Sequence, residues 1–101
     1  MRVLVMFDLP SVSPEEMRAY RAFRKFLLKS GFIMVQESVY SKLALNMTVA
    51  NGIISNIRKN SPETGLVQLL VVTEKQYGKM EFIVGNRQTE ILESDERLVV
   101  F

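Results

Sequence analysis

The chain of 101 residues contains no cysteine, no histidine and no tryptophan. Without cysteine it has neither a disulfide framework nor a thiolate nucleophile, which agrees with a reducing, cytoplasmic location. Without histidine it cannot form a Ser-His-Asp triad or a typical zinc site. Any chemistry must therefore use carboxylates, hydroxyls, lysine or arginine, together with a cation that prefers oxygen ligands.

Long apolar runs are also missing. No stretch approaches the ~20 apolar residues of a membrane span. The first apolar run is too short to be a secretory signal, and Asp8 and Pro10 follow it at once. The length suits one domain with one hydrophobic core. We therefore expect a single globular domain with no membrane partner.

The formal net charge is only +2, but it is unevenly distributed. Residues 1–60 carry nine lysines and arginines against four acids, whereas residues 61–101 carry four against seven. A basic half suits binding to phosphate backbones. Ordinary solvated helix faces would explain the same charges equally well.

The first strand is the part around which we expect the fold to be built. Val3 to Phe7 are all apolar, and pairing should stop before Pro10, which cannot donate a ladder hydrogen bond. Alternation places odd-numbered residues on one face and even-numbered residues on the other. Both faces are therefore apolar, and the carboxylate of Asp8 stands at the end of the strand.

The rest of the chain predicts two helices and further strands. In order, the expected elements are a helix from Ser13 (its N-cap) to Ser30, a strand over Phe32–Tyr40 with a bulge near Gln36, a helix from Asn46 to Lys59, a strand over Leu66–Thr73, a polar turn over Glu74–Lys79, and strands over Met80–Val84 and Arg97–Phe101. With right-handed crossovers we expect an α+β, ferredoxin-like βαββαβ sandwich over residues 1–85, with an extra C-terminal β-strand in residues 86–101.

Two helices can cover only one face of such a sheet. The other face, which carries either Leu4 and Met6 or the opposite residues of the first strand, would be exposed together with the matching residues of the Leu66–Thr73 strand. Because apolar burial contributes ~25 cal/mol per Å², we expect a two-fold homodimer packed sheet to sheet. We expect the tail, residues 86–101, to make dimer or partner contacts by adding its strand to an open sheet edge.

Asp8 has two interpretations. It can be a strand-end aspartate that caps the following turn. It can also be a ligand for Mg²⁺ or Mn²⁺, since a two-fold axis could bring two copies of Asp8 together. Periodicity alone leaves both interpretations open.

An ordered set of motifs resembles the small CRISPR-associated endoribonuclease family, the smaller of the two core spacer-acquisition proteins. The residues that carry the resemblance are Phe7-Asp8-Leu9-Pro10, then Arg21, Leu27, Gly31, Gln36 and Ser38-Val39-Tyr40. It extends over residues 1 to about 85. The resemblance implies a ferredoxin-like fold, homodimers formed through the sheets, and first-strand aspartates that face each other and hold a divalent metal. Asp8 would thus be the catalytic and metal-binding residue, with Mg²⁺ (or Mn²⁺) as cofactor.

The resemblance also implies partners. Family members sit between two CRISPR integrase dimers and bind the backbone of double-stranded DNA without reading its sequence. The family-type endonuclease activity on RNA or DNA adds single-stranded RNA as an expected ligand. Exposed basic residues of the first helix are the candidate nucleic-acid contacts, namely Arg18, Arg21, Arg24 and Lys25.

Several functions compete on these observations. The chain could be a non-catalytic bridge in spacer acquisition, a metal-dependent nuclease, or a free-standing ribonuclease toxin on the same fold. An RNA-recognition module is disfavoured, because Leu66–Thr73 lacks the aromatic residues that stack on bases. The main prediction is an adaptation protein with an associated metal-dependent nuclease activity.

Overall fold

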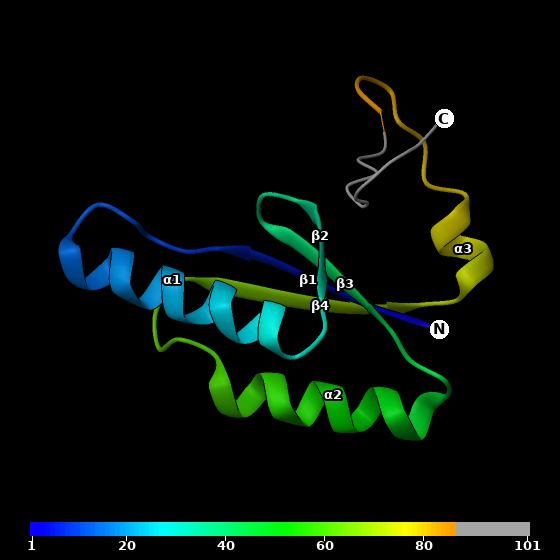
Figure 1. Ribbon diagram of the computed structural model, residues 1–101, viewed down its shortest axis with the longest axis horizontal. Coiled ribbons are helices and arrows are strands. Elements are labelled where there is room, and N and C mark those ends of the chain that lie inside the picture. Colours follow the sequence, from blue (N-terminus) through cyan, green and yellow to red (C-terminus); the bar gives the residue numbers. More distant parts are fainter. Residues whose placement is uncertain (87–101) are drawn as a thin grey trace.

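The computed structural model describes residues 1–86 of the chain (Figure 1). Its elements are, in order, β1 (Arg2–Asp8), α1 (Pro14–Lys29), β2 (Ile33–Gln36), β3 (Val39–Leu43), α2 (Met47–Asn60), β4 (Leu66–Val72) and α3 (Glu74–Gly78). The strands form one four-stranded sheet in the order β2-β3-β1-β4, and every neighbouring pair is antiparallel. The predicted α+β class and the chain order βαββαβ are confirmed through β4.

The core lies between one face of the sheet and the helices α1 and α2. Its buried members are Val3, Val5, Phe7, Leu9, Phe23, Leu27, Phe32, Tyr40, Ala44, Ala50 and Ile57. Because the odd-numbered residues of β1 pack with residues of both helices, α1 and α2 cover the same face, as expected. We call the opposite face, which carries the even-numbered residues of β1 and is covered by neither α1 nor α2, the helix-free face.

The sequence signals at the start of α1 are confirmed. Ser13 is the N-cap, and its hydroxyl accepts a hydrogen bond from the Glu16 N–H at 3.1 Å, while the Glu16 carboxylate accepts one from the Ser13 N–H at 2.9 Å. Farther along the helix, Phe23 and Leu27 point into the core. The end of α1 is held from β3, because the Lys42 ammonium donates to the Ser30 carbonyl.

The prediction of one long strand over Phe32–Tyr40 is wrong. The chain forms β2, turns at Glu37 and Ser38, and returns as β3, with the expected irregularity between Met34 and Gln36. The polar residues of this stretch provide the turn of a hairpin between two apolar runs. This hairpin supplies the strand that the βαββαβ order requires.

Two predictions after β4 are also wrong. The expected polar turn over Glu74–Lys79 contains α3, which begins with a capping box between Thr73 and Gln76. The expected strand over Met80–Val84 is not a strand, and its residues are exposed. Apolar alternation alone forms no strand without a neighbouring strand to pair with, and none in residues 1–86 pairs with this segment. The predicted strand over Arg97–Phe101 lies outside the described residues.

None of the helices within residues 1–86 combines the length and the apolar character needed to cross a bilayer.

Candidate functional site

Asp8 is the last residue of β1 and lies at the end of a strand paired on both sides. In the register of β1 with β4, Asp8 lies opposite Leu66, and in β1 with β3 the pairing ends at Met6. The Asp8 side chain belongs to the helix-free face and is exposed. A rigid central strand therefore presents one carboxylate to the surface.

The predicted motif residues near Asp8 hold this strand end in place. The Phe7 N–H donates a hydrogen bond to the Ser38 carbonyl at 3.1 Å. On the core side, the rings of Phe7 and Tyr40 stack with centroids 5.7 Å apart, and Phe23 meets Phe7 edge-on at 5.2 Å. Ser38 and Tyr40 thus support the end of β1, and the Tyr40 ring lies on the face opposite Asp8.

The helix-free face remains open and mainly apolar around β1 and β4, with the exposed polar residue Gln68 opposite Met6. Leu66 and Leu70 of β4 are each 53% exposed, and Met6 of β1 is half-buried. Cross-strand partners on one face lie within side-chain contact distance. The exposed carboxylate of Asp8 is therefore next to an apolar surface, which we call the β1–β4 surface, defined by Met6, Leu66 and Leu70.

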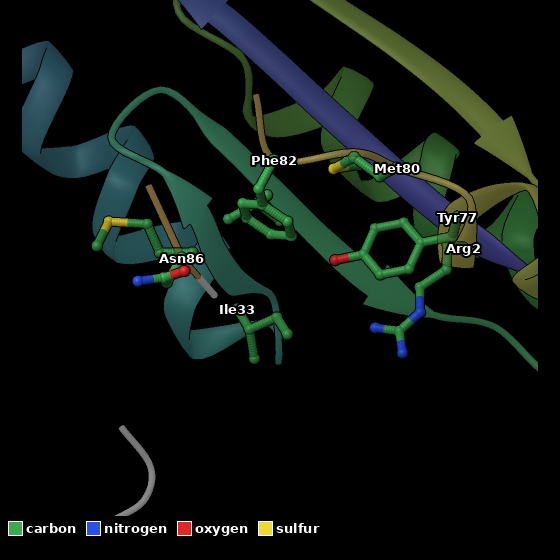
Figure 2. A pocket seen from close by; sticks show the side chains of 8 residues that line it. Arg2, Ile33, Tyr77, Met80, Phe82 and Asn86 are labelled. Carbon is green, nitrogen blue, oxygen red and sulfur yellow. The ribbon is translucent and has the colours of Figure 1, made fainter. Parts of the chain in front are cut away.

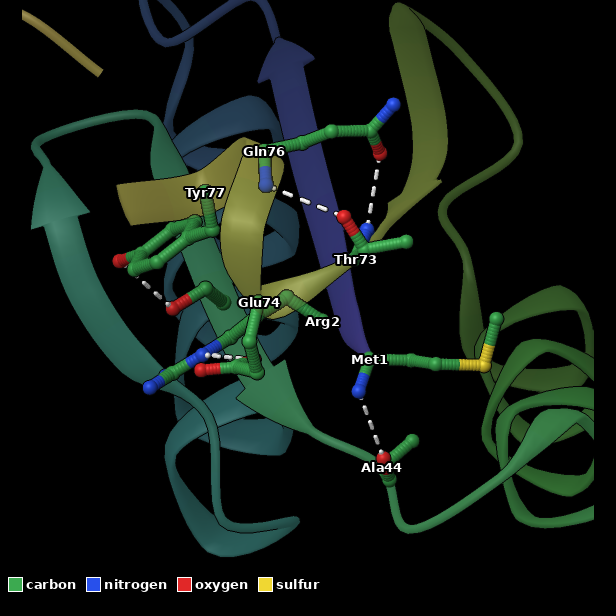
Figure 3. A network of polar contacts seen from close by, with 8 residues as sticks. Met1, Arg2, Ala44, Thr73, Glu74, Gln76 and Tyr77 are labelled. Carbon is green, nitrogen blue, oxygen red and sulfur yellow. Dashed lines mark hydrogen bonds and ion pairs between the residues drawn. The ribbon is translucent and has the colours of Figure 1, made fainter. Parts of the chain in front are cut away.

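Another part of the helix-free face is covered by α3, contrary to the expectation that all of it faces solvent, whereas Ile33 and Leu43 on the same face remain more than half exposed. Arg2 donates to Glu74 at 2.8 Å and lies 4.6 Å from the centre of the Tyr77 ring, and the Tyr77 and Ser41 hydroxyls are 3.3 Å apart (Figure 3). These contacts hold α3 over β1 and β3 and bury Leu4. These contacts were not predicted from the sequence, in which the local signal for them is an arginine at the start of an apolar strand.

A cavity of about 160 Å³ lies beside α3 (Figure 2). It is lined by Arg2, Ile33, Met34, Val35, Tyr77, Met80, Phe82 and Asn86. Among residues 1–86, this lining includes no carboxylate, and Arg2 is already paired with Glu74. The described lining therefore offers no anionic ligand of the kind that a hard cation prefers.

The candidate nucleic-acid residues Arg18, Arg21, Arg24 and Lys25 are all exposed on α1. At 3.6 residues per turn, Arg18, Arg21 and Lys25 fall on the side of the helix opposite Phe23 and Leu27. Arg24 lies at the flank of that side. The structure therefore brings three of the four together and keeps them away from the sheet face that carries Asp8.

A single chain offers few ligands for a metal. Within residues 1–86 there is no group of three or more acidic side chains that could hold an ion. The carboxylate of Glu16 is engaged elsewhere, since hydrogen bonds from the Ser13 and Val12 N–H groups lower its pKa. A site built on Asp8 is therefore incomplete without further ligands.

Comparisons with known proteins point to one family. A family model described as CRISPR associated protein Cas2 matches residues 1–80. A protein of Treponema denticola named CRISPR-associated endoribonuclease Cas2 is 60% identical over 100 residues, covering 99% of both chains. The chain belongs to the Cas2 family. Proteins of the same name from Streptococcus mutans, 52% identical over 98% of this chain and 91% of the relative, and Ligilactobacillus salivarius, 42% identical over 99% of both, are further relatives.

The Cas2 family match spans every element that the structure describes, from β1 to α3. It therefore includes Asp8 at the end of β1, the basic side of α1 and the β1–β4 surface. The resemblance found in the sequence is confirmed as family membership.

Proposed function

We propose that this chain acts in CRISPR adaptation as a two-fold homodimer of ferredoxin-like domains packed through the β1–β4 surface. One observation supports it above all: the exposed carboxylate of Asp8 lies on the same face as the exposed side chains of Leu66 and Leu70. Apolar burial at ~25 cal/mol per Å² favours covering such a surface. In a two-fold contact the same patch meets itself, so each Asp8 gains a second copy nearby.

The paired Asp8 carboxylates would hold Mg²⁺ or Mn²⁺. The donor chemistry fits, because Mg²⁺ is commonly held by one or two carboxylates, with water and phosphate oxygens completing its shell. When bound, such an ion polarises a phosphate and lowers the pKa of its water. The chain itself contributes a rigid strand end, fixed by the Phe7–Ser38 hydrogen bond, that keeps each carboxylate in place.

On this basis the dimer would be a metal-dependent endonuclease that cleaves RNA or DNA. The relatives' name, CRISPR-associated endoribonuclease, supports RNA as the substrate. Phosphodiester cleavage needs positioning and charge stabilisation more than a protein nucleophile, so the lack of histidine and cysteine is no obstacle.

The same dimer would bridge two CRISPR integrase dimers and bind duplex DNA between them. The basic side of α1 supports this role, because exposed Arg18, Arg21 and Lys25 form a row that can follow a phosphate backbone. Residues 86–101 would form the tail that contacts the dimer partner or the integrase.

The substitution Asp8→Asn tests the catalytic part of this proposal. It removes the charge but keeps the size of the side chain. We expect cleavage of single-stranded RNA with Mn²⁺ or Mg²⁺ to fall by about 100-fold or more. Spacer acquisition in cells should continue, because bridging and backbone binding do not use Asp8.

The matched control is Glu15→Gln, which removes one exposed carboxylate from α1 rather than from the sheet face. It should leave the cleavage rate within about twofold, the range expected for a surface substitution. Equal activity of Asp8→Asn and the unaltered protein would refute the catalytic role. Loss of acquisition by Asp8→Asn would contradict the separation between bridging and cleavage.

A further inference from the structure

Gly65, the residue before β4, touches the segment that carries Asp8. A Cβ atom added to Gly65 would lie 2.7 Å from Leu9 Cδ2, 3.0 Å from the backbone oxygen of Asp8 and 3.1 Å from Pro10 Cδ. Real Cβ atoms essentially never approach within 3.0 Å of another heavy atom. Gly65 also has a φ of +92°, a conformation that favours glycine. Only a residue without a side chain fits here.

The segment opposite Gly65 has no room to move into the domain. Leu9 is buried in the core cluster, so its side chain cannot retreat without displacing packed neighbours. On the other side, Asp8 is held in register with Leu66, the residue after Gly65. A side chain at position 65 would therefore push the end of β1 outward and weaken the terminal Asp8–Leu66 pairing.

We propose that Gly65 is a positioning residue for Asp8: its bare backbone sets where the two Asp8 carboxylates meet across the two-fold axis. This inference rests on the proposed dimer. Misplacement of a reacting group by about 1 Å can cost about 100-fold in rate, so a small shift at this strand end has a large effect.

Another glycine provides a matched control. Gly31 has nearly the same φ, +93°, but a Cβ there would meet only the side chain of Lys42, at 3.3 Å from the Nζ atom that donates to the Ser30 carbonyl. Gly31 follows α1 and does not touch the Asp8 segment. Alanine at either position introduces the same backbone strain, and only alanine at position 65 presses on Asp8.

The test uses a single-cysteine cross-link. Because the chain has no cysteine, Asp8→Cys introduces a unique thiol at the proposed two-fold contact. A disulfide forms only when the two Cα atoms come within about 7 Å. In the full-length Asp8→Cys protein, we expect Gly65→Ala to slow oxidative dimer cross-linking by at least about tenfold and Gly31→Ala to change it less than twofold, in line with the strictness of that geometry.

A second measurement uses chains that keep Asp8. Mn²⁺ affinity, followed by the loss of the free-ion electron paramagnetic resonance signal, should weaken about tenfold in Gly65→Ala and stay within twofold in Gly31→Ala, since a displaced ligand loses its coordination geometry. Thermal unfolding checks that both variants are folded at the temperature of the two measurements. If Gly65→Ala does not fold, Gly65→Asn and Gly31→Asn replace the pair, because asparagine tolerates a positive φ better.

Each outcome decides one part. Slower cross-linking in Gly65→Ala alone supports the inference. Equal cross-linking in the two variants overturns it and leaves the dimer standing. No cross-linking in Asp8→Cys, together with sedimentation of the unaltered protein as a monomer, overturns both the dimer and the role of Gly65. If the unaltered protein sediments as a dimer but Asp8→Cys does not cross-link, equal Mn²⁺ affinities of Gly65→Ala and Gly31→Ala overturn the role of Gly65. If cross-linking follows the expectation but the unaltered protein does not bind Mn²⁺, the metal site is refuted and Gly65 remains the positioning residue.

Discussion

Two tyrosine hydroxyls in this domain have opposite surroundings. The hydroxyl of Tyr40 is buried in the core and has no hydrogen-bond partner within residues 1–86. The hydroxyl of Tyr77 faces that of Ser41, a fully buried polar residue, at 3.3 Å. A buried hydroxyl without a hydrogen-bond partner costs the free energy of removing it from water, whereas a hydrogen bond to a partner recovers most of that cost. The same chemical change at the two tyrosines should therefore have different effects.

We predict that Tyr77→Phe lowers the free energy of unfolding by about 1 kcal/mol, because it leaves the buried Ser41 hydroxyl unpaired. Tyr40→Phe should leave stability unchanged or raise it slightly, since it removes a hydroxyl that has no partner within residues 1–86. Urea denaturation followed by circular dichroism measures both. Equal losses in the two variants would mean that the Ser41–Tyr77 contact contributes nothing specific.

The carboxylate of Glu16 makes stability depend on pH. Hydrogen bonds from the Ser13 and Val12 N–H groups lower the pKa of Glu16 in the folded state. Because the pKa of Glu16 is lower in the folded state than in the unfolded state, its ionised form stabilises the fold. This stabilisation is complete above the unfolded-state pKa and is lost as pH falls through the folded-state pKa. Glu16→Gln keeps an acceptor oxygen at the cap but cannot ionise.

We therefore predict that the unaltered protein melts at a higher temperature than Glu16→Gln at neutral pH. The difference should shrink as the solution is acidified below the ordinary pKa of a glutamate. Melting curves recorded from neutral pH down to about pH 3, below that ordinary value, measure it. A difference that stays constant over this range would show that the charge of Glu16 is not responsible.

Among the elements, α1 has one side that packs in the core and an opposite side that exposes basic residues. One side packs Phe23 and Leu27 into the core, while the opposite side exposes Arg18, Arg21 and Lys25. Substitutions on the basic side can therefore change binding without disturbing the fold. The end of α2 offers a comparable pair of exposed charges, Arg58 and Lys59.

We predict that the double substitution of Arg21 and Lys25 to Gln weakens binding to duplex DNA by roughly tenfold at physiological salt. The plot of log K against log salt has a negative slope, and the magnitude of this slope should decrease by about 0.9 for each phosphate that the variant no longer neutralises. The double substitution of Arg58 and Lys59 to Gln removes the same charge and serves as the control. Titrations at several salt concentrations distinguish them, and equal slopes in both variants would contradict a DNA-binding surface on α1.

At the level of the whole molecule, the β1–β4 surface is an exposed, mainly apolar surface beside Asp8. Its exposed leucines contrast with Leu4, which is buried on the part of the helix-free face where α3 lies. If this surface forms the dimer, a charge placed in it would be buried twice in each two-fold contact. Leu45, 86% exposed in the connection between β3 and α2, provides a control outside the sheet face.

We predict that Leu70→Glu shifts the protein from dimer to monomer, with the dimer Kd raised by at least about 100-fold, because an unpaired buried charge costs about 3 kcal/mol or more. Leu45→Glu should leave the Kd unchanged. Sedimentation equilibrium over a range of micromolar concentrations measures both. A monomeric unaltered protein, or equal Kd values for all three proteins, would refute the proposed interface.

Features encoded by neighbouring residues were predictable from the sequence. The capping box of Ser13 and Glu16, the N-cap at Asn46 and the two apolar faces of β1 need only local geometry, so pattern and spacing define them. The family membership was likewise predictable, because its motifs follow one another in order along the chain. The position of Asp8 at the end of the first strand was predictable for the same reason, because it is an acid that follows an apolar run.

Features that depend on distant partners required the tertiary structure. The placement of α3 over part of the helix-free face depends on contacts of Arg2 and Ser41 with residues far along the chain, Glu74 and Tyr77. The constraint on Gly65 comes from packing against Asp8 and Leu9, which the pattern of a short polar loop does not reveal. Because a strand also needs a neighbour to pair with, only the assembled sheet could decide that Met80–Val84 is not one.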